Sequence, residues 1–208
     1  ADIVIGGILS TGGGGGNGNI TIETTGVNSD ITMNNTAPTA IGATGDLVIT
    51  SAADFNQDGQ LLFAGATRNA TITAANNITM GIAGATTNAT GGITTYTAGN
   101  NLAVNTIDVG ANALSLTATA GSIADANGVS LNVTADTVDF ISATGIDLDL
   151  SHAGTLNINQ ALATSGGNID LENIDGSGGF TLLGNVAAGT GQVQLTANAD
   201  VLQTGGTL

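Results

Sequence analysis

A short unit recurs from one end of this chain to the other. A few residues alternate between apolar and small polar types, and a Gly, Asn or Ala-Thr break then precedes the next unit. Such a period of two places apolar side chains on one face of an extended strand and polar side chains on the other, so each unit predicts a short β-strand. The clearest copies are Asn19–Ile22, Asp46–Ile49, Gln60–Phe63, Leu114–Leu116, Val138–Phe140, Ile146–Leu150 and Gln192–Leu195.

The even spacing of these units indicates one repeating coil rather than a set of different elements. The breaks return about every 8 to 15 residues, and no segment shows the helical period of 3.6 over ten or more residues. We therefore expect an all-β fold, a parallel β-helix or solenoid, with no α-helical cap. With about 20 residues in each turn the chain would make roughly ten coils. Residues 1–208 form a single continuous segment in this interpretation, with a glycine-rich loop near 12–18.

The hydrophobic core must be built almost without aromatic side chains. The 208 residues include four Phe, one Tyr and no Trp. Stacked rows of Ile, Leu and Val solve this problem, because each coil buries its apolar face on the next one. The positions that we expect to point inward are Ile20, Leu47, Leu61, Ile72, Leu116, Leu131, Ile146, Leu148, Leu156, Ile169 and Val193.

Charge and cysteine content exclude several classes of partner. The chain has 16 acidic residues against one Lys or Arg, for a formal net charge of −15. Nucleic acid and anionic membrane surfaces are bound through Lys and Arg, so neither is an expected partner. No apolar run approaches the roughly 20 residues that cross a bilayer, and we expect no membrane insertion. The absence of Cys excludes disulfides and thiolate metal sites.

Solenoids need polar end caps, because an open end exposes apolar side chains and unpaired backbone groups. The sequence offers no such cap at either end. We therefore expect the segment either to continue into further coils of the same polypeptide or to stack end to end on copies of itself.

The second half of the chain resembles a family. Several segments are similar to the recurring sequence motifs of large repetitive bacterial surface proteins of the filamentous-haemagglutinin type: Gly121–Gly128, Asn132–Val138, Ala143–Ile146 and Ser165–Leu171. Gly16–Ile22 is similar to the glycine-rich segments that begin their coils. The resemblance implies a right-handed parallel β-helix that is exported to the bacterial cell surface or beyond it. It also implies a role in adhesion or extracellular scaffolding.

One local motif suggests a cation. Asp54, Asn56 and Asp58, followed by Gly59, match the D-x-N-x-D-G opening of a calcium-binding loop. The complete loop requires an acidic residue at its twelfth position, which here is Gly65. An ordinary turn rich in Asp and Asn is the alternative. Apart from this Ca²⁺ site we expect no cofactor.

Other polar residues do not form a recognisable catalytic set. Asp147 and Asp149 lie two apart, so we expect both on the outer face of a strand whose inner face carries Ile146, Leu148 and Leu150. His152 is the only His, and no G-x-S-x-G motif accompanies it. We expect no enzymatic activity.

Two Thr-x-Thr segments raise a further alternative. Thr71–Thr73 and Thr117–Thr119 could belong to a flat threonine array of the ice-binding kind. Such an array must repeat in register on successive coils, and no regular repeat of this kind is visible in the sequence.

The sequence therefore favours a structural segment of an extracellular fibre, sheath or adhesin stalk. The alternative is a binding module that recognises surface glycans or another ligand, with or without Ca²⁺. Clustered exposed aromatic residues would favour the alternative, because they stack on sugars, but the chain has few.

Overall fold

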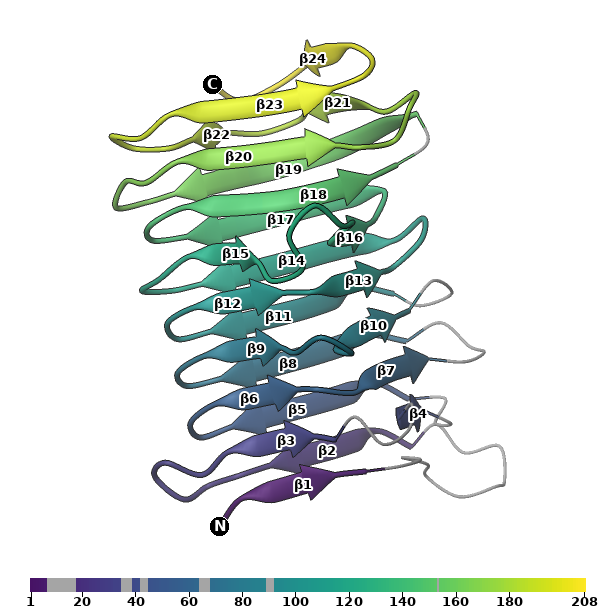
Figure 1. The fold of residues 1–208 in the computed structure, drawn as a ribbon, viewed down its shortest axis with the longest axis vertical. Coiled ribbons are helices and arrows are strands. Elements are labelled where there is room, and N and C mark those ends of the chain that lie inside the picture. The colour runs from purple at the N-terminus through teal and green to yellow at the C-terminus, as the bar shows by residue number, and fades with distance from the viewer. Residues whose placement is uncertain (7–17, 35–38, 42–44, 64–67, 89–91, 153) are drawn as a thin grey trace.

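The computed structural model describes residues 1–6, 18–34, 39–41, 45–63, 68–88, 92–152 and 154–208. Within these residues every regular element is a β-strand and none is a helix, so no helix among them could cross a membrane. The strands form a β-solenoid of stacked coils, as the sequence predicted (Figure 1). Most of the glycine-rich loop expected near 12–18 lies outside the described residues.

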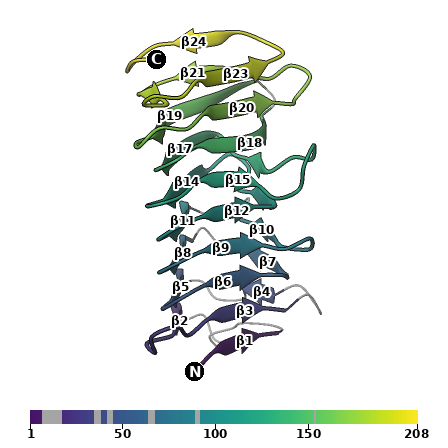
Figure 2. The same ribbon diagram turned by 60° about the vertical axis from the view of Figure 1, so that its left-hand side comes forward.

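The coils build two sheets that face each other across the core (Figures 1 and 2). All strand pairs in both sheets are parallel, and a strand inside a stack pairs with strands of the coils before and after it. The ten-stranded sheet contains β2 (Ile20–Glu23), β5 (Leu47–Ser51), β8 (Ala70–Ala74), β11 (Thr94–Ala98), β14 (Ala113–Ala118), β17 (Thr137–Ser142), β19 (Thr155–Ala163), β21 (Gly179–Leu182), β22 (Val186–Ala187) and β24 (Val201–Gln203).

The fourteen-stranded sheet consists of two stacks that β18 joins. Ile146 at the start of β18 pairs with one stack, and Leu150 and Ser151 at its end pair with the other. The first stack is β1 (Ile3–Ile5), β3 (Ile31–Met33), β6 (Phe55–Gln57), β9 (Ile78–Met80), β12 (Leu102–Val104), β15 (Ile123–Asp125), β18 (Ile146–Ser151), β20 (Ile169–Asn173) and β23 (Val193–Ala197). The second is β4 (Thr39–Ile41), β7 (Gln60–Phe63), β10 (Ala85–Thr87), β13 (Thr106–Asp108) and β16 (Val133–Thr134).

Each coil contributes one strand to the first stack, which contains nine strands, against the roughly ten coils expected. Coils are longer than the sequence suggested, because 23 residues separate the equivalent positions Asp54 and Asn77, and 24 separate Asn77 from Asn101. Connections such as residues 126–132, between β15 and β16, take up the additional length.

Alternate residues of the strands point into one continuous core. Its largest fully buried side chains are Tyr96, Phe55, Phe140 and Phe180, packed among rows of Ile, Leu, Val and Ala. Of the positions expected to point inward, eight are buried: Leu47, Leu61, Ile72, Leu116, Ile146, Leu148, Leu156 and Ile169.

The other three positions differ. Ile20 and Val193 are partly buried and pack against the core. Leu131 is only half-buried, in the loop that precedes β16, and the neighbouring Asn132 and Val133 take the buried places instead. Leu131 was therefore a wrong choice for an inward position, because the loop interrupts the alternation on which the prediction relied.

Side chains at one corner of the coil form a ladder that runs from coil to coil. The residue before most strands of the first stack carries a side-chain oxygen that accepts a hydrogen bond from the backbone N–H of the equivalent residue in the next coil. Gly145, before β18, has no side chain and interrupts the series. Oδ1 of Asp30 accepts from Asp54 N at 3.0 Å, Oδ1 of Asp54 from Asn77 N at 2.9 Å and Oδ1 of Asn77 from Asn101 N at 3.2 Å. Oδ1 of Asn101 accepts from Ser122 N at 3.1 Å.

A second ladder precedes four successive strands of the ten-stranded sheet, β2, β5, β8 and β11. Oδ1 of Asn19 accepts from Asp46 N at 3.1 Å, Oδ1 of Asp46 from Asn69 N at 2.8 Å and Oδ1 of Asn69 from Ile93 N at 3.0 Å. Both ladders satisfy backbone donors at corners, where the chain turns. They explain why Asn and Asp so often stand immediately before an alternating unit.

Glycine before a ladder residue leaves room for the side chain of the previous coil. A Cβ on Gly45 would lie 2.4 Å from Oδ1 of Asn19, and one on Gly121 would lie 2.2 Å from Oδ1 of Asn101. No side chain fits at such distances without displacing the ladder. The recurring Gly-polar-apolar pattern of the sequence is therefore a packing requirement of the corner.

A polar cluster inside the core ties three strands together. The Tyr96 hydroxyl donates to Oε1 of Gln57 at 2.9 Å and lies 2.6 Å from Oγ1 of Thr86. Nε2 of Gln57 donates to Oγ1 of Thr86 at 2.9 Å. Burial raises the pKa of Tyr96, which keeps its hydroxyl protonated. These hydrogen bonds offset the cost of placing polar groups in the core and link β6, β10 and β11.

The ladder predicts a measurable stability effect at Asn101. Replacing Asn101 by Ala removes the acceptor of the Ser122 N–H, and we expect the free energy of unfolding to fall by about 0.5–1.5 kcal/mol. Urea denaturation measures this difference. Asn101→Asp retains an oxygen acceptor and is the matched control. Equal stability of Asn101→Ala and the parent would show that water replaces the ladder at no cost.

The core position of Leu148 predicts a larger effect. Leu148 is 1% exposed, so Leu148→Asp buries an unpaired carboxylate and should lower the free energy of unfolding by more than about 4 kcal/mol. Asp149→Ala, which changes the next residue on the outer face, should change it by less than about 0.5 kcal/mol. Thermal unfolding of both variants tests whether Leu148 points inward. A Leu148→Asp protein as stable as the parent would contradict this assignment.

Candidate functional site

Acidic side chains gather on the outer face of the fourteen-stranded sheet. Asp147 and Asp149 project from β18, with Ile146, Leu148 and Leu150 buried beneath them, in the alternation that the sequence predicted. On the next coil Asp170 pairs in register with Asp147, and Glu172 with Asp149. Asp125, at the end of β15, is in register with the buried Val104 and lies beside this face, close enough to affect Asp147 and Asp149. We call the five carboxylates together the acidic face: Asp125, Asp147, Asp149, Asp170 and Glu172.

Proximity and partial burial make two of these carboxylates harder to ionise. Desolvation, followed by the charges of Asp170 and Asp125, raises the pKa of Asp147. Desolvation and then the charges of Asp125 and Glu172 raise the pKa of Asp149. Neighbouring strands lie about 4.8 Å apart, so carboxylates paired in register repel each other. Within the described residues no positive side chain joins the acidic face.

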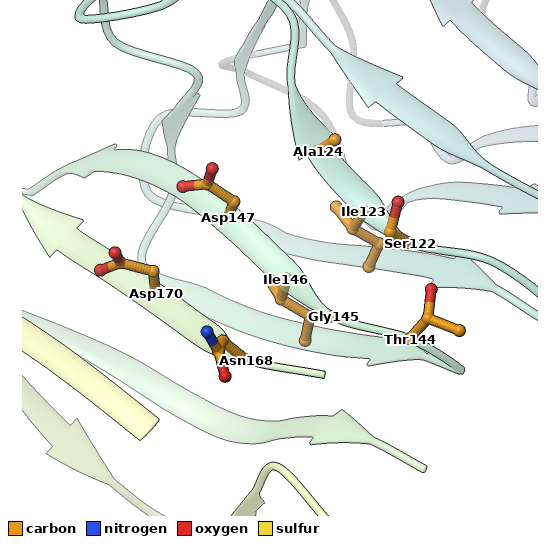
Figure 3. Close-up of a pocket in the computed structure, with 9 residues that line it drawn as sticks. All are labelled: Ser122, Ile123, Ala124, Thr144, Gly145, Ile146, Asp147, Asn168 and Asp170. Carbon is orange, nitrogen blue, oxygen red and sulfur yellow. The ribbon is translucent and has the colours of Figure 1, made fainter. Parts of the chain in front are cut away.

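A shallow hollow borders this face. It has a volume of about 300 Å³, and its lining includes Ser122, Thr144, Asn168, Asp147 and Asp170. Figure 3 shows Asp147 and Asp170 projecting in the same direction from neighbouring strands. The hydroxyl and amide groups of the lining lie at the corner, next to the ladder position Asn168, whose Oδ1 accepts from Gln192 N at 3.0 Å.

The predicted calcium motif has a different shape from a cation-binding loop. Residues Phe55–Gln57 form strand β6, so Asp54, Asn56 and Asp58 follow one outer face of an extended segment instead of wrapping around a centre. Oδ1 of Asp54 already accepts from N and Nδ2 of Asn77, at 2.9 and 3.0 Å. Among the described residues no group of three or more His, Cys, Asp or Glu side chains is arranged to hold a metal ion. Calcium binding stays a prediction that depends on ligands beyond these three side chains.

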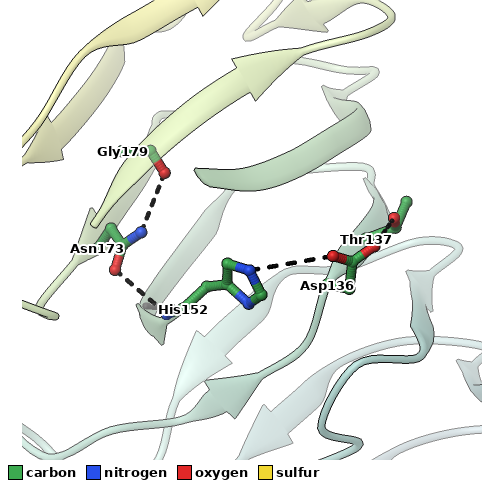
Figure 4. A network of polar contacts seen from close by, with 5 residues as sticks. All are labelled: Asp136, Thr137, His152, Asn173 and Gly179. Atoms are coloured by element: carbon green, nitrogen blue, oxygen red, sulfur yellow. Dashed lines mark hydrogen bonds and ion pairs between the residues drawn. The ribbon is translucent and has the colours of Figure 1, made fainter. Parts of the chain in front are cut away.

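His152, the only histidine of the chain, takes part in a small group of polar contacts just after β18 (Figure 4). Nε2 of His152 lies 3.9 Å from Oδ1 of Asp136, and Oδ2 of Asp136 accepts from the Thr137 hydroxyl at 3.1 Å. The backbone N–H of His152 donates to Oδ1 of Asn173 at 3.4 Å, and Nδ2 of Asn173 donates to the Gly179 carbonyl. The contacts of His152 within the described residues include no serine hydroxyl, so they do not assemble a Ser-His-Asp triad.

Two projecting connections enclose a second hollow, of about 420 Å³. Ile82, in the connection between β9 and β10, lines one side, and Ala126, Asn127 and Ser130, in the connection between β15 and β16, line the other. Asn105 and Thr106 also line it. The apolar tips Ile82 and Val129 are fully exposed, at 102% and 98%.

A buried asparagine organises the longer of these connections, which sequence reasoning missed. Asn132 is fully buried, and its Nδ2 donates to Oδ1 of Asp125 at 2.8 Å and to Oδ1 of Asn127 at 3.1 Å. Its Oδ1 accepts from the backbone N–H of Asp149 at 2.8 Å. Asp125 is thus fixed at the edge of the acidic face. The sequence shows no signal for this role, because Asn is also frequent at exposed corners.

The raised pKa values of the acidic face predict a dependence of stability on pH. A raised pKa means that the folded state binds protons more readily, so stability contributed by this face falls as pH rises through the ordinary carboxyl range. Asp170→Asn removes a charge beside Asp147 and should raise the melting temperature at pH 7 but not at pH 2.5. Asp175→Ala is the control, and it should lower the melting temperature at pH 7. Hydrogen bonds from the Ser177 backbone and hydroxyl lower the pKa of Asp175, so its ionised form stabilises the fold. Thermal unfolding at several pH values gives the melting temperatures of both variants. A melting temperature of Asp170→Asn below that of the parent at pH 7 would contradict repulsion between the Asp147 and Asp170 carboxylates.

Comparison of the chain with family models, curated proteins and solved structures found no significant match. The resemblance to surface proteins of the filamentous-haemagglutinin type therefore depends on the sequence motifs alone.

Proposed function

We propose that this chain is a structural segment of an extracellular bacterial fibre, sheath or adhesin stalk and that it has no catalytic activity. The observation that carries the proposal is the continuity of the coil-to-coil hydrogen bonding. Parallel backbone pairing runs through both sheets, and corner ladders of Asn and Asp join several successive coils beside it. Because each coil is bonded to both neighbours over an unbroken core, the segment acts as a stiff spacer.

The polar groups support a structural role better than a catalytic one. The carboxylates of the acidic face lie on an open sheet surface, whereas paired catalytic carboxylates need a pocket that separates their pKa values. Arg68 is the only Arg or Lys of the chain and is 3% exposed. A substrate that carries or develops negative charge would thus meet few stabilising groups.

An extracellular location at the bacterial cell surface fits the same properties. The chain has no Cys, and its stability comes from the stacked ladder. Its negative charge of −15 favours solubility of an extended assembly. The resemblance to exported repetitive proteins points to the same location.

The expected partner is another β-solenoid coil. The core residues that remain only partly buried lie in the first and last coils: Ile3, Ile20 and Ile22, and Val193, Leu195 and Ala197. Strands β23 and β24 pair on one side only, and Val201 and Leu202 of β24 are exposed at 44% and 51%. A further coil, from the same polypeptide or from a second copy, would bury these side chains and pair these backbone groups.

The alternative function is that of a glycan-binding module, with or without Ca²⁺. The hollow of about 420 Å³ between the two projecting connections favours it, since Ile82 offers an apolar contact and Asn127 and Ser130 offer polar groups. This combination suits an uncharged sugar.

Negative-stain electron microscopy of the purified 208-residue chain, with and without Ca²⁺, tests the proposal. We expect filaments of uniform width in which coils of successive copies stack. Leu195→Asp, which places a charge at the open end, should shorten them, whereas Thr79→Asp on the exposed outer face of β9 should not. Filaments that require Ca²⁺ would support the Asp54 motif. Single short particles that bind a glycan array would favour the binding module instead.

A further inference from the structure

The outer face of the ten-stranded sheet carries hydroxyl groups in two parallel columns. In one column Thr71 of β8 pairs with Thr95 of β11, which pairs with Ser115 of β14. In the other column Thr50 of β5 pairs with Thr73, then Thr97, then Thr117. The face therefore presents Thr-x-Thr on two successive coils and Ser-x-Thr on the third. We call these residues the threonine array: Thr50, Thr71, Thr73, Thr95, Thr97, Ser115 and Thr117.

This register corrects the expectation that the Thr-x-Thr segments do not repeat from coil to coil. The repeat is hidden in the sequence because coils differ in length: the chain runs farther between Thr71 and Thr95 than between Thr95 and Ser115. The segment Thr117–Thr119 was also the wrong unit to compare with Thr71–Thr73, because Thr73 and Thr97 align with Thr117.

The hydroxyls of the threonine array are available to solvent. All its residues are partly exposed, and the side chains between them, such as Ile72 and Tyr96, are buried in the core. Within the described residues no hydrogen bond of these hydroxyls to another protein group is present. Their hydrogen-bonding capacity is left for water or for a ligand.

The array is uncharged and regular, with charged residues only beyond its ends. Val48 occupies the remaining position on β5, in register with Thr71. On the preceding coil Glu23 of β2 pairs with Thr50, and on the following coil Asp139 of β17 pairs with Ser115. The strand pairs from β5 to β14 keep a constant register without a bulge, whereas a bulge follows Val138 in the pairing of β17 with β19.

The spacing of the array is fixed by backbone geometry. Neighbouring parallel strands lie about 4.8 Å apart, and residues i and i+2 on one strand lie about 6.6 Å apart. Both repeats are close to oxygen–oxygen repeats on the faces of hexagonal ice. Thr is β-branched and has restricted rotamers, so its hydroxyl and methyl groups occupy nearly fixed positions. A surface already ordered in this way loses little entropy when it binds a regular lattice of water.

We propose that the threonine array binds ice, through water molecules that its hydroxyl and methyl groups hold in an ice-like arrangement. This activity is independent of the proposed role as a spacer, because it uses one outer face and neither end of the solenoid. Other ligands suit the face less well. It has no charge to bind an ion, and Tyr96, the one aromatic side chain in the strands of the array, points into the core and offers no stacking surface for sugars.

Ice-affinity partition of the purified 208-residue chain is the test, together with thermal hysteresis measured by osmometry. We expect the parent to enter slowly growing ice and to shape ice crystals within a hysteresis gap. The double variant Thr95→Lys and Thr97→Lys places bulky charged side chains in the middle of both columns. Its partition should fall to the level of a protein with no affinity for ice.

Thr79→Lys is the matched control. Thr79 is an exposed outward residue of β9 on the fourteen-stranded sheet, where it pairs with Asn56 and Ala103. This variant should retain the ice partition of the parent, and circular dichroism should show all the proteins folded.

Two results would overturn the proposal. The parent protein could remain excluded from ice, and a dimer that the double variant dissociates would then make the array an interface between copies. Alternatively, Thr79→Lys could lose partition as fully as the double variant. If the double variant fails to fold, the single variant Thr95→Lys takes its place, and its partition should also fall below that of the parent.

Discussion

Parallel pairing of each coil with the next is the constraint on which the rest of this molecule depends. A residue in one strand must match its equivalent in the following coil, so the polypeptide has to return to the same place after about two dozen residues. The backbone groups of the strands satisfy one another in this way, and those of the corners need additional acceptors. The Asn and Asp ladders provide them at the starts of the strands, and glycine beside them leaves the space that they require.

This constraint separates the inside of the solenoid from the outside. Inward positions are restricted to apolar side chains and to fully paired polar clusters such as Gln57, Thr86 and Tyr96. Outward positions accept many residue types, and the two sheets carry different side chains on their outer faces. One sheet carries the acidic face, where carboxylates in register repel one another, and the other carries the uncharged threonine array. Any recognition by a solenoid of this kind would depend on such outer surfaces.

The fold could be predicted from the sequence because a period of two and regular breaks have few structural solutions. Asp147 and Asp149 were placed correctly on the outer face by alternation alone. Alternation failed at Leu131, where a loop stabilised by the buried Asn132 interrupts the pattern. The length of a coil was underestimated, because the lengths of the connections are not visible in the pattern of the strands.

The surfaces could not be predicted, because they depend on register between residues of different coils. Asp170 and Glu172 join Asp147 and Asp149 only through the pairing of β18 with β20, and the columns of the threonine array emerge only through the pairing of β5, β8, β11 and β14. The motif at Asp54 matches a calcium-binding loop in sequence but lies along a strand, so calcium binding there would depend on which further groups the neighbouring coils bring to it. A local motif identifies residue types, and the coil register decides which of them meet.

Amide hydrogen exchange measured by nuclear magnetic resonance tests the central claim most directly. The account predicts that the corner amides of Asn77, Asn101 and Ser122 exchange as slowly as amides within the strands, because each donates to a side chain of the previous coil. Fast exchange at these corners, with slow exchange confined to the strands, would contradict a solenoid whose coils are joined through their corners as well as through their sheets.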